Sequence, residues 1–309
     1  MVMASACSSA PSESTSGTPT SVSFGGPKFS VVIVTTDLGV GTNRVAFGLV
    51  DREGMPIRPA EAQVTASLLD AETKTSEVRS TSVAHFQQWP RGTQGVLTTQ
   101  LFLDKPGFWQ LNVEATTVDG SAVEAKGAFQ VKANSDTPTV GQPAPRSATL
   151  TLDSLEDPSD LTTISSATTP DPDLYRMSVD AALDTGRPLI LVFSTPAFCI
   201  SATCGPQVAL ISELKEKYQA RVNFIHVEVF ENPHLIEGGR PMGDTVAAVN
   251  EWNLPSEPWT FIIDGDGLVR AKFEQFTTKE EIETALLDPV SYPHLRAHAT
   301  LRYLVCRLL

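Results

Sequence analysis

Continuous apolar runs in the second half of the chain constrain its fold more than any other feature. The segment 188–193 reads Pro-Leu-Ile-Leu-Val-Phe, and the segments 222–230 and 259–263 are also rich in apolar residues. A strand shows a continuous apolar run when both faces of its sheet are covered. The intervening segments have the composition of helices, which we expect at 174–185, 205–219, 243–252 and 278–287. This alternation predicts an α/β domain over residues 173–289.

The first half of the chain has a different pattern. Between residues 24 and 133, six short segments rich in β-branched and aromatic residues alternate with turn signals such as Asp104-Lys-Pro-Gly107. Strands of this length and spacing are typical of an immunoglobulin-like β-sandwich. We expect its core to contain alternating apolar side chains, such as Phe102, Trp109, Leu111 and Val113.

The charge balance excludes some classes of partner. The chain has 309 residues and a formal net charge of −13, with Lys and Arg scattered rather than clustered. This balance argues against nucleic acid as a partner and provides no basic patch for anionic lipid. No stretch of the sequence approaches the ~20 apolar residues that cross a bilayer.

Three further segments differ in composition from both halves. Residues 1–23 are small and polar, which predicts a disordered tether. Residues 134–172 are rich in Pro, Ser, Thr and Asp, as inter-domain linkers are. Residues 290–309 become abruptly basic and resemble translated adapter sequence that contaminates genome assemblies. We therefore expect the last segment to be a non-native tail.

Cys7 is a candidate lipidation site. The small residues 4–6 directly before it resemble the end of a bacterial lipoprotein signal, in which the cysteine after the cleavage site receives the lipid. The apolar region that precedes such a site is missing, which indicates a truncated start. The resemblance implies an extracytoplasmic protein of the cell envelope that is lipid-anchored to the membrane, and an ordinary disordered start is the alternative.

Cys199 and Cys204 carry the strongest chemical signal. They lie where the apolar run 188–193 gives way to the helix expected over 205–219. A thiol at a helix N-terminus meets unsatisfied N–H groups and the positive end of the helix dipole, which favour the thiolate. Cys204 is thus placed as a nucleophile, with Cys199 close enough to resolve a mixed disulfide. The reverse assignment stays open.

The second half resembles the thioredoxin-like superfamily in its element order, β-α-β-α-β-β-α, and in the position of its cysteines. The segment 140–145, Val-Gly-Gln-Pro-Ala-Pro, is similar to the lead-in of many redoxin domains. The usual redox motif is Cys-Gly-Pro-Cys, whereas here Gln207 replaces the second cysteine and four residues separate Cys199 from Cys204. The resemblance implies a thioredoxin-like fold and thiol-disulfide exchange on protein substrates.

The segment 257–260, Glu-Pro-Trp-Thr, is a second mark of this resemblance. Thioredoxin-like proteins keep a cis-proline opposite the cysteines, just before a buried strand, where backbone polar groups stay open to a substrate chain. The resemblance therefore implies a cis bond before Pro258. It also implies catalytic roles for Cys199, Cys204 and Pro258, with substrate contacts from Phe198, Glu257 and Trp259.

Two other roles for the cysteine pair stay open. One is a purely structural disulfide, which an oxidising compartment permits. The other is metal binding, because thioredoxin-like copper chaperones of respiratory oxidase assembly use two cysteines and a histidine, a set that suits a soft ion. His226 and His234 are the candidate third ligands.

We therefore predict a multidomain protein with an all-β immunoglobulin-like sandwich followed by an α/β thioredoxin-like domain. It is expected to act outside the cytoplasm as a thiol-disulfide oxidoreductase on protein cysteines, without a cofactor. The alternatives are a copper-binding protein that uses the same cysteines and a redox-inactive interaction module.

Overall fold

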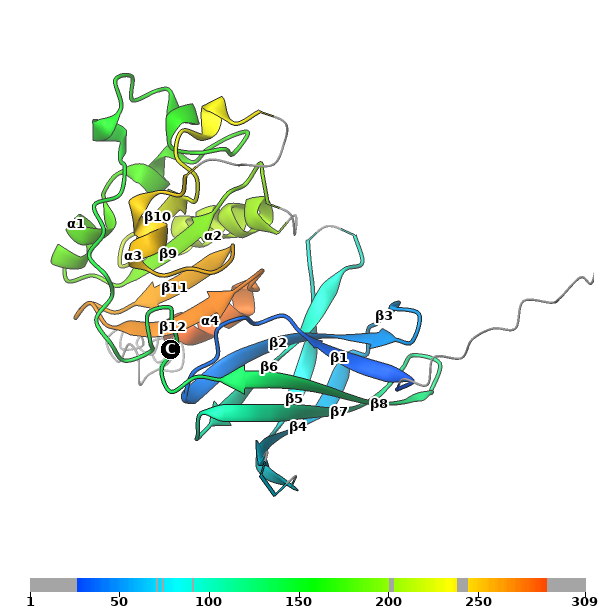
Figure 1. The fold of residues 1–309 in the computed structure, drawn as a ribbon. Coiled ribbons are helices and arrows are strands. Elements are labelled where there is room, and N and C mark those ends of the chain that lie inside the picture. Colours follow the sequence, from blue (N-terminus) through cyan, green and yellow to red (C-terminus); the bar gives the residue numbers. More distant parts are fainter. Residues whose placement is uncertain are drawn as a thin grey trace, which may run out of the picture.

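The computed structural model describes residues 27–70, 72–73, 75–90, 92–199, 203–237 and 244–287. The expected tether, the candidate lipidation site Cys7 and the expected non-native tail lie outside these ranges. Within them the chain forms two sheets joined by a long connecting segment (Figure 1). None of the described helices is long and apolar enough to cross a membrane.

The first sheet has eight strands and closes on itself. Its order is β1-β8-β7-β4-β5-β6-β2-β3, and β1 also pairs with β2, so all strands except β3 form a closed barrel. The pairs in this ring are antiparallel, apart from the short parallel contact between β1 and β8. The strands are β1 (Phe29–Ile33), β2 (Gly41–Asp51), β3 (Pro56–Ile57), β4 (Glu61–Asp70), β5 (Thr75–Gln88), β6 (Gly95–Leu103), β7 (Gly107–Thr116) and β8 (Ala122–Val131).

The strands expected between residues 24 and 133 are confirmed, but they close into a barrel instead of forming two separate sheets. Trp109, Leu111 and Val113 lie in the barrel core as expected. Phe102 does not, because 59% of its surface is exposed. Its neighbours on β6 point inward, and successive side chains of a strand face opposite sides of the sheet.

The second sheet has four strands in the order β10-β9-β11-β12. β9 (Leu189–Ser194) runs parallel to β10 (Asn223–Glu228) and antiparallel to β11 (Trp259–Ile263), which pairs antiparallel with β12 (Val269–Glu274). Every residue of β9, β10 and β11 is buried, as their apolar runs predict. Side chains of α2 (Cys204–Tyr218) and α4 (Lys279–Leu287) share one apolar cluster with the sheet, and those of α1 (Val179–Asp184) and α3 (Ala247–Glu251) share the other.

The prediction of a C-terminal α/β thioredoxin-like fold class is wrong. The described chain is mostly β, and the sheet that closes into the barrel has eight strands, against four in the second sheet. Its α-helices are short in the described ranges: α1 has 6 residues, α3 has 5, α4 has 9 and α2 has 15. The apolar pattern locates strands and helices along the chain, but it specifies neither the length of a helix nor the closure of a sheet.

Residues 134–172 connect the two sheets and also pack against the second one. The Gly141 N–H donates to Val269 O at 2.7 Å, and the Val269 N–H donates to Gln142 O at 2.9 Å, so this segment borders β12. Thr137 and Ile164 are buried along its course. The segment therefore belongs to the packed structure, although its composition is that of a linker.

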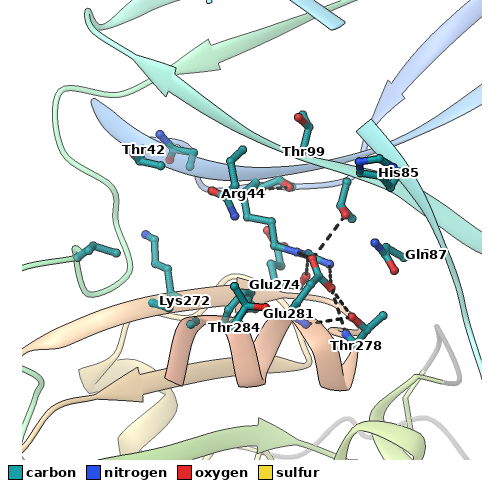
Figure 2. A pocket seen from close by; sticks show the side chains of 18 of the residues that line it. Thr42, Arg44, His85, Gln87, Thr99, Lys272, Glu274, Thr278, Glu281 and Thr284 are labelled. Atoms are coloured by element: carbon teal, nitrogen blue, oxygen red, sulfur yellow. Dashed lines mark hydrogen bonds and ion pairs between the residues drawn. The ribbon is translucent and has the colours of Figure 1, made fainter. Parts of the chain in front are cut away.

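Arg44 on β2 joins the barrel to the second sheet. Its guanidinium contacts the Glu281 carboxylate of α4 and donates to the backbone oxygens of Glu274 and Phe276 at 3.1 and 3.2 Å. A cavity of about 860 Å³ lies beside this contact, lined by strands of the barrel, β12 and α4 (Figure 2). The two units are thus held together by buried charged groups.

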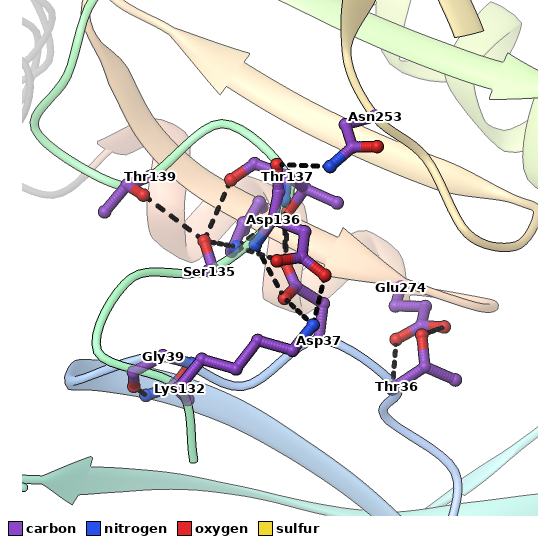
Figure 3. Close-up of polar contacts among 12 residues, drawn as sticks. Thr36, Asp37, Gly39, Lys132, Ser135, Asp136, Thr137, Thr139, Asn253 and Glu274 are labelled. Carbon is purple, nitrogen blue, oxygen red and sulfur yellow. Dashed lines mark hydrogen bonds and ion pairs between the residues drawn. The ribbon is translucent and has the colours of Figure 1, made fainter. Parts of the chain in front are cut away.

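A second polar contact surrounds Asp37 at the edge of the barrel (Figure 3). Its carboxylate accepts hydrogen bonds from the N–H groups of Asp136 and Thr137 at 2.9 and 3.0 Å. It also lies 3.3 Å from the Lys272 ammonium of β12, which donates to the hydroxyls of Ser135 and Thr137. Asp37 therefore fixes the beginning of the connecting segment against both units.

Candidate functional site

Cys199 and Cys204 form a disulfide. Cys199 lies in the loop after β9 and Cys204 is the first residue of α2, and their Cα atoms are 5.9 Å apart. Cys204 is completely buried, whereas Cys199 is half-buried. Cys199 is therefore the more accessible of the two, which favours it as the sulfur that an external reactant meets first.

The local sequence explains why the cysteines meet at this place. A turn follows β9, in which the Phe198 N–H donates to Thr195 O at 3.2 Å and reverses the chain. The helix α2 then begins, with the Gln207 N–H donating to Thr203 O at 2.9 Å. Pro206 fits this first turn because its position needs no N–H donor. The pair thus lies between the carboxyl end of a buried strand and the N-terminus of a helix.

Glu257 completes the site. One of its carboxylate oxygens and the sulfurs of Cys199 and Cys204 all lie within 4.8 Å of one another. Its Oε2 atom is buried and has no hydrogen-bond partner among the residues that the structure describes. Glu257 directly precedes Pro258 and β11, and the pairing of Trp259 with Phe193 brings the start of β11 beside the end of β9. The sheet register therefore places this carboxyl group next to the cysteines.

Burial raises the pKa of Glu257 to about 7, and the negative charge of Glu228 acts in the same direction. A hydrogen bond from the Thr195 backbone N–H opposes this effect in part. The Glu257 carboxyl group therefore changes its protonation state near neutral pH, so it can hold a proton or bind a cation beside the sulfurs.

Hydrogen bonds through Glu274 connect the segment that carries Glu257 to the barrel. The Ser256 hydroxyl donates to the Glu274 carboxylate at 2.6 Å and accepts a hydrogen bond from the ring N–H of Trp259. The same carboxylate accepts from the N–H and the hydroxyl of Thr36 at 2.7 and 2.8 Å (Figure 3). Glu274 therefore ties the segment next to Glu257 to the barrel.

Pro258, Phe198 and Trp259 are the other residues predicted for this site. The peptide bond between Glu257 and Pro258 is cis, which confirms that prediction. Phe198 is half-buried in the loop with Cys199. Trp259 is only 1% exposed and its ring stacks on Phe261, so its side chain presents almost no surface to a substrate.

The two histidines expected as metal ligands are outside the group of ligand atoms at the cysteines. His226 is buried, and its Nε2–H donates to Ser194 O at 3.0 Å while its Nδ1 accepts from the Tyr175 hydroxyl at 2.5 Å. Burial lowers the pKa of His226, which keeps the ring neutral. His234 is exposed. Among the described residues, the group of ligand atoms at the cysteines contains Glu257 and neither histidine.

Sequence reasoning missed Glu257 as a potential ligand and gave it only a substrate-binding role. An acidic residue next to a proline at the start of a buried strand was the available signal. Its proximity to the sulfurs depends on the pairing of β11 with β9, which local sequence does not reveal.

No protein-family model matches the chain, and no curated protein matches it. Solved structures that match include murine CRIg, at 12% identity over 34% of this chain and 96% of that one, with a TM-score of 0.22. CopC from Methylosinus trichosporium OB3b matches at 17% identity over 33% of this chain and 93% of that one, with a TM-score of 0.21. MtrC from Shewanella baltica OS185 matches at 12% identity over 50% of this chain and 28% of that one, with a TM-score of 0.24.

The structure overturns the predicted family. The chain was expected to resemble thioredoxin-like oxidoreductases, yet its described part is mostly β with a closed barrel and short helices, and no family model supports that assignment. The prediction is wrong because it rested on element order and cysteine placement, two features that a short sheet with a cysteine pair can share without kinship. At these TM-scores the three likenesses carry no argument about function, which has to come from the site.

Proposed function

We propose that the reduced pair Cys199 and Cys204 binds a soft metal ion, copper(I), with Glu257 as a neighbouring oxygen ligand. The observation that carries the proposal is the convergence of two sulfurs and one carboxylate oxygen within 4.8 Å. Thiolates select soft ions such as copper(I) over hard ions such as Mg²⁺ or Ca²⁺. The donor set therefore suits copper(I) better than an ion that prefers oxygen ligands alone.

The surroundings of the donors support the same function. Cys204 begins α2, where the helix N-terminus favours a thiolate, the form that binds a metal. Within the described part of the chain, the buried Oε2 of Glu257 has no hydrogen-bond partner. A buried acceptor without a partner is costly, and a bound cation would relieve that cost. A cation here would also lower the pKa of Glu257 and favour its carboxylate form.

The redox state of the pair would control binding. The disulfide cannot act as a pair of thiolate ligands, so an external dithiol must first reduce it. In that step the Cys199–Cys204 S–S bond takes up two electrons and two protons and gives two thiols, while the dithiol becomes a disulfide. The metal then replaces the two thiol protons.

The proposal includes a location outside the cytoplasm, in the cell envelope. The formed disulfide between Cys199 and Cys204 supports it, because the cytosol keeps most protein thiols reduced. A lipid anchor at Cys7 is part of the same proposal. Metabolic labelling with a radioactive fatty acid tests the anchor: label is expected on the natural chain and absent from Cys7→Ser.

A titration with copper(I) tests the proposed function. The full chain is reduced with dithiothreitol, freed of reductant without oxygen, and titrated against the copper(I) chelator bathocuproine disulfonate. One copper(I) per chain is expected. The double variant Cys199→Ser/Cys204→Ser is expected to lose this binding, while the matched control Cys7→Ser/Cys306→Ser keeps it.

Two outcomes would overturn the proposal. One is a double variant at residues 199 and 204 that binds copper(I) as tightly as the natural chain. The other is a natural chain that binds no copper(I) in the reduced state. Insulin reduction measured in parallel distinguishes copper binding from thiol-disulfide exchange. Catalytic reduction of insulin without copper binding would identify the exchange activity expected from the sequence.

A further inference from the structure

A second cavity, of about 360 Å³, lies beside the carboxyl end of β10. Its inner wall contains three buried polar side chains, those of Tyr175, His226 and Glu228. Leu150 and Glu231, which also line it, are exposed. The cavity thus combines a buried polar floor with an accessible rim, which is the usual form of a site for a small molecule.

The described side chains that line this cavity carry negative charge. Its described lining residues include the carboxylates of Glu228 and Glu231 and no Lys or Arg. Glu228 is only 4% exposed. Its two oxygens accept hydrogen bonds from the backbone N–H groups of Val229 and Ser166 at 3.0 and 2.8 Å. These bonds satisfy part of the carboxylate, but they add no positive charge.

No cation of the described chain neutralises Glu228. Its carboxylate forms no ion pair with a Lys or Arg among the residues that the structure describes. The neighbouring His226 is neutral, because its Nδ1 accepts from the Tyr175 hydroxyl while its Nε2–H donates to Ser194 O. A buried charge without a partner is costly, and buried charges in proteins are normally paired.

Other lining groups fit a ligand with both a charged and an apolar part. The hydroxyl oxygen of Thr163 is buried and has no hydrogen-bond partner in the described ranges. Phe230 offers an aromatic ring, whose face attracts cations. Ile164, Val246 and Ala248 provide apolar wall. An ammonium group could therefore meet Glu228 and Thr163 while a short hydrocarbon chain contacts the apolar side chains.

We propose that this cavity binds a small organic cation, an ammonium group on a short apolar chain, with Glu228 as its counter-charge. The proposal does not rest on the metal site, because it uses none of the residues Cys199, Cys204 or Glu257 as contacts of the ligand, although the charge of Glu228 acts on Glu257. Its volume of about 360 Å³ is at the lower end of the range for ligand cavities, which limits the ligand to a small molecule.

Calorimetric titration of the full chain tests this proposal with three probes of similar shape: butylammonium, butanol and butyrate. Butylammonium is expected to bind at least 10-fold more tightly than butanol, and butyrate is expected not to bind. Glu228→Gln is expected to weaken butylammonium binding at least 10-fold. The matched control Glu231→Gln, at the exposed rim, is expected to change it less than 3-fold.

A cavity-filling variant keeps the test valid if Glu228→Gln fails to fold. Ala247 is exposed on α3 and lines the cavity, so Ala247→Trp should block the ligand while Glu228 stays in place. Butanol binding as tightly as butylammonium would overturn the proposal, as would unchanged butylammonium binding by Glu228→Gln or Ala247→Trp. The Cys199→Ser/Cys204→Ser variant should bind butylammonium normally, so failure of the metal proposal leaves this one intact.

Discussion

The guanidinium of Arg44 and the carboxylate of Glu281 meet at two points, with Nε–Oε1 at 2.7 Å and Nη2–Oε2 at 3.1 Å, although the residues belong to the barrel and to the last described helix. The Arg44 side chain is only 4% exposed. Two parallel hydrogen bonds of this kind are among the strongest charge-assisted contacts in proteins. This contact therefore orients the barrel against the second sheet.

Removing one partner of this buried pair should destabilise the protein strongly. We expect Arg44→Ala to lower the free energy of unfolding by about 3 kcal/mol, because it leaves the Glu281 carboxylate without its cation and two backbone oxygens without a donor. Urea unfolding followed by tryptophan fluorescence measures the change. Arg146→Ala is the matched control, since Arg146 pairs with Asp184 at the surface, and it should cost less than about 1 kcal/mol. Equal losses in the two variants would contradict the structural role of Arg44.

Asp37 should contribute to stability only above strongly acidic pH. Burial raises the pKa of its carboxyl group, but the Lys272 ammonium and hydrogen bonds from residues 136 and 137 outweigh this effect and lower the pKa from 3.8 to about 2. A depressed pKa means that the stabilisation is present above pH 3.8 and is lost as the pH falls toward 2. Urea unfolding at several pH values should show this loss in the natural chain.

Asp37→Asn is the corresponding variant. It should be less stable than the natural chain at pH 6 and should lack this part of the decline in acid. Burial lowers the pKa of Lys272 while Asp37 raises it, so the variant also leaves that buried ammonium with fewer favourable contacts. A variant with the same acid dependence as the natural chain would show that Asp37 does not titrate in this range.

Glu257 should make copper(I) binding depend on pH near neutrality. Below its pKa of about 7 the carboxyl group is protonated and cannot act as a ligand, so the affinity of the reduced protein should rise as the pH passes from 6 to 8. Glu257→Gln should bind copper(I) about 10-fold more weakly at pH 8 and show a shallower pH dependence. Competition with a copper(I) chelator at each pH measures both effects, and identical profiles for the two proteins would exclude Glu257 as a ligand.

Glu228 should influence the protonation of Glu257 from the neighbouring cavity. Its negative charge is the second cause of the raised pKa of Glu257, after burial. Glu228→Gln should therefore lower this pKa from about 7 toward 4.5 without reaching it, since burial remains. NMR titration of the ¹³C-labelled side-chain carboxyl groups measures the value. Glu231→Gln is the control, and a shift of equal size in that variant would contradict a specific effect of Glu228.

The raised pKa of Glu257 also predicts how the free energy of unfolding changes with pH. The raised pKa of Glu257 means that its ionisation opposes folding, so this group lowers the free energy of unfolding as the pH rises from 4.5 to 7. Glu257→Gln lacks that loss and should be more stable than the natural chain above pH 7. In Glu228→Gln the pKa of Glu257 should be lower. The free energy of unfolding should therefore fall by less, and the fall should be complete at a lower pH.

Sequence patterns located much of the second half correctly. The strand expected over 259–263 is observed at Trp259–Ile263, and the helix expected over 278–287 is observed at Lys279–Leu287. The cis bond before Pro258 is also confirmed. The strand and the helix depend on neighbouring residues along the chain, which form an apolar run and a helical pattern, so local sequence is sufficient for them. The cis bond was inferred from a resemblance and from the order of the strands, not from local sequence alone.

By itself, then, the sequence determined the approximate positions of the strands and helices along the chain, and which two cysteines lie at the junction of β9 and α2. Only the tertiary structure decided that β1 pairs with both β2 and β8 to close a barrel, which made the expected fold class wrong. It also decided that Glu257 lies next to the cysteine pair and that Glu228 is buried without an ion pair to any described Lys or Arg. Such contacts join residues far apart in the chain, so they follow from strand register and the packing of distant elements, which no local pattern contains.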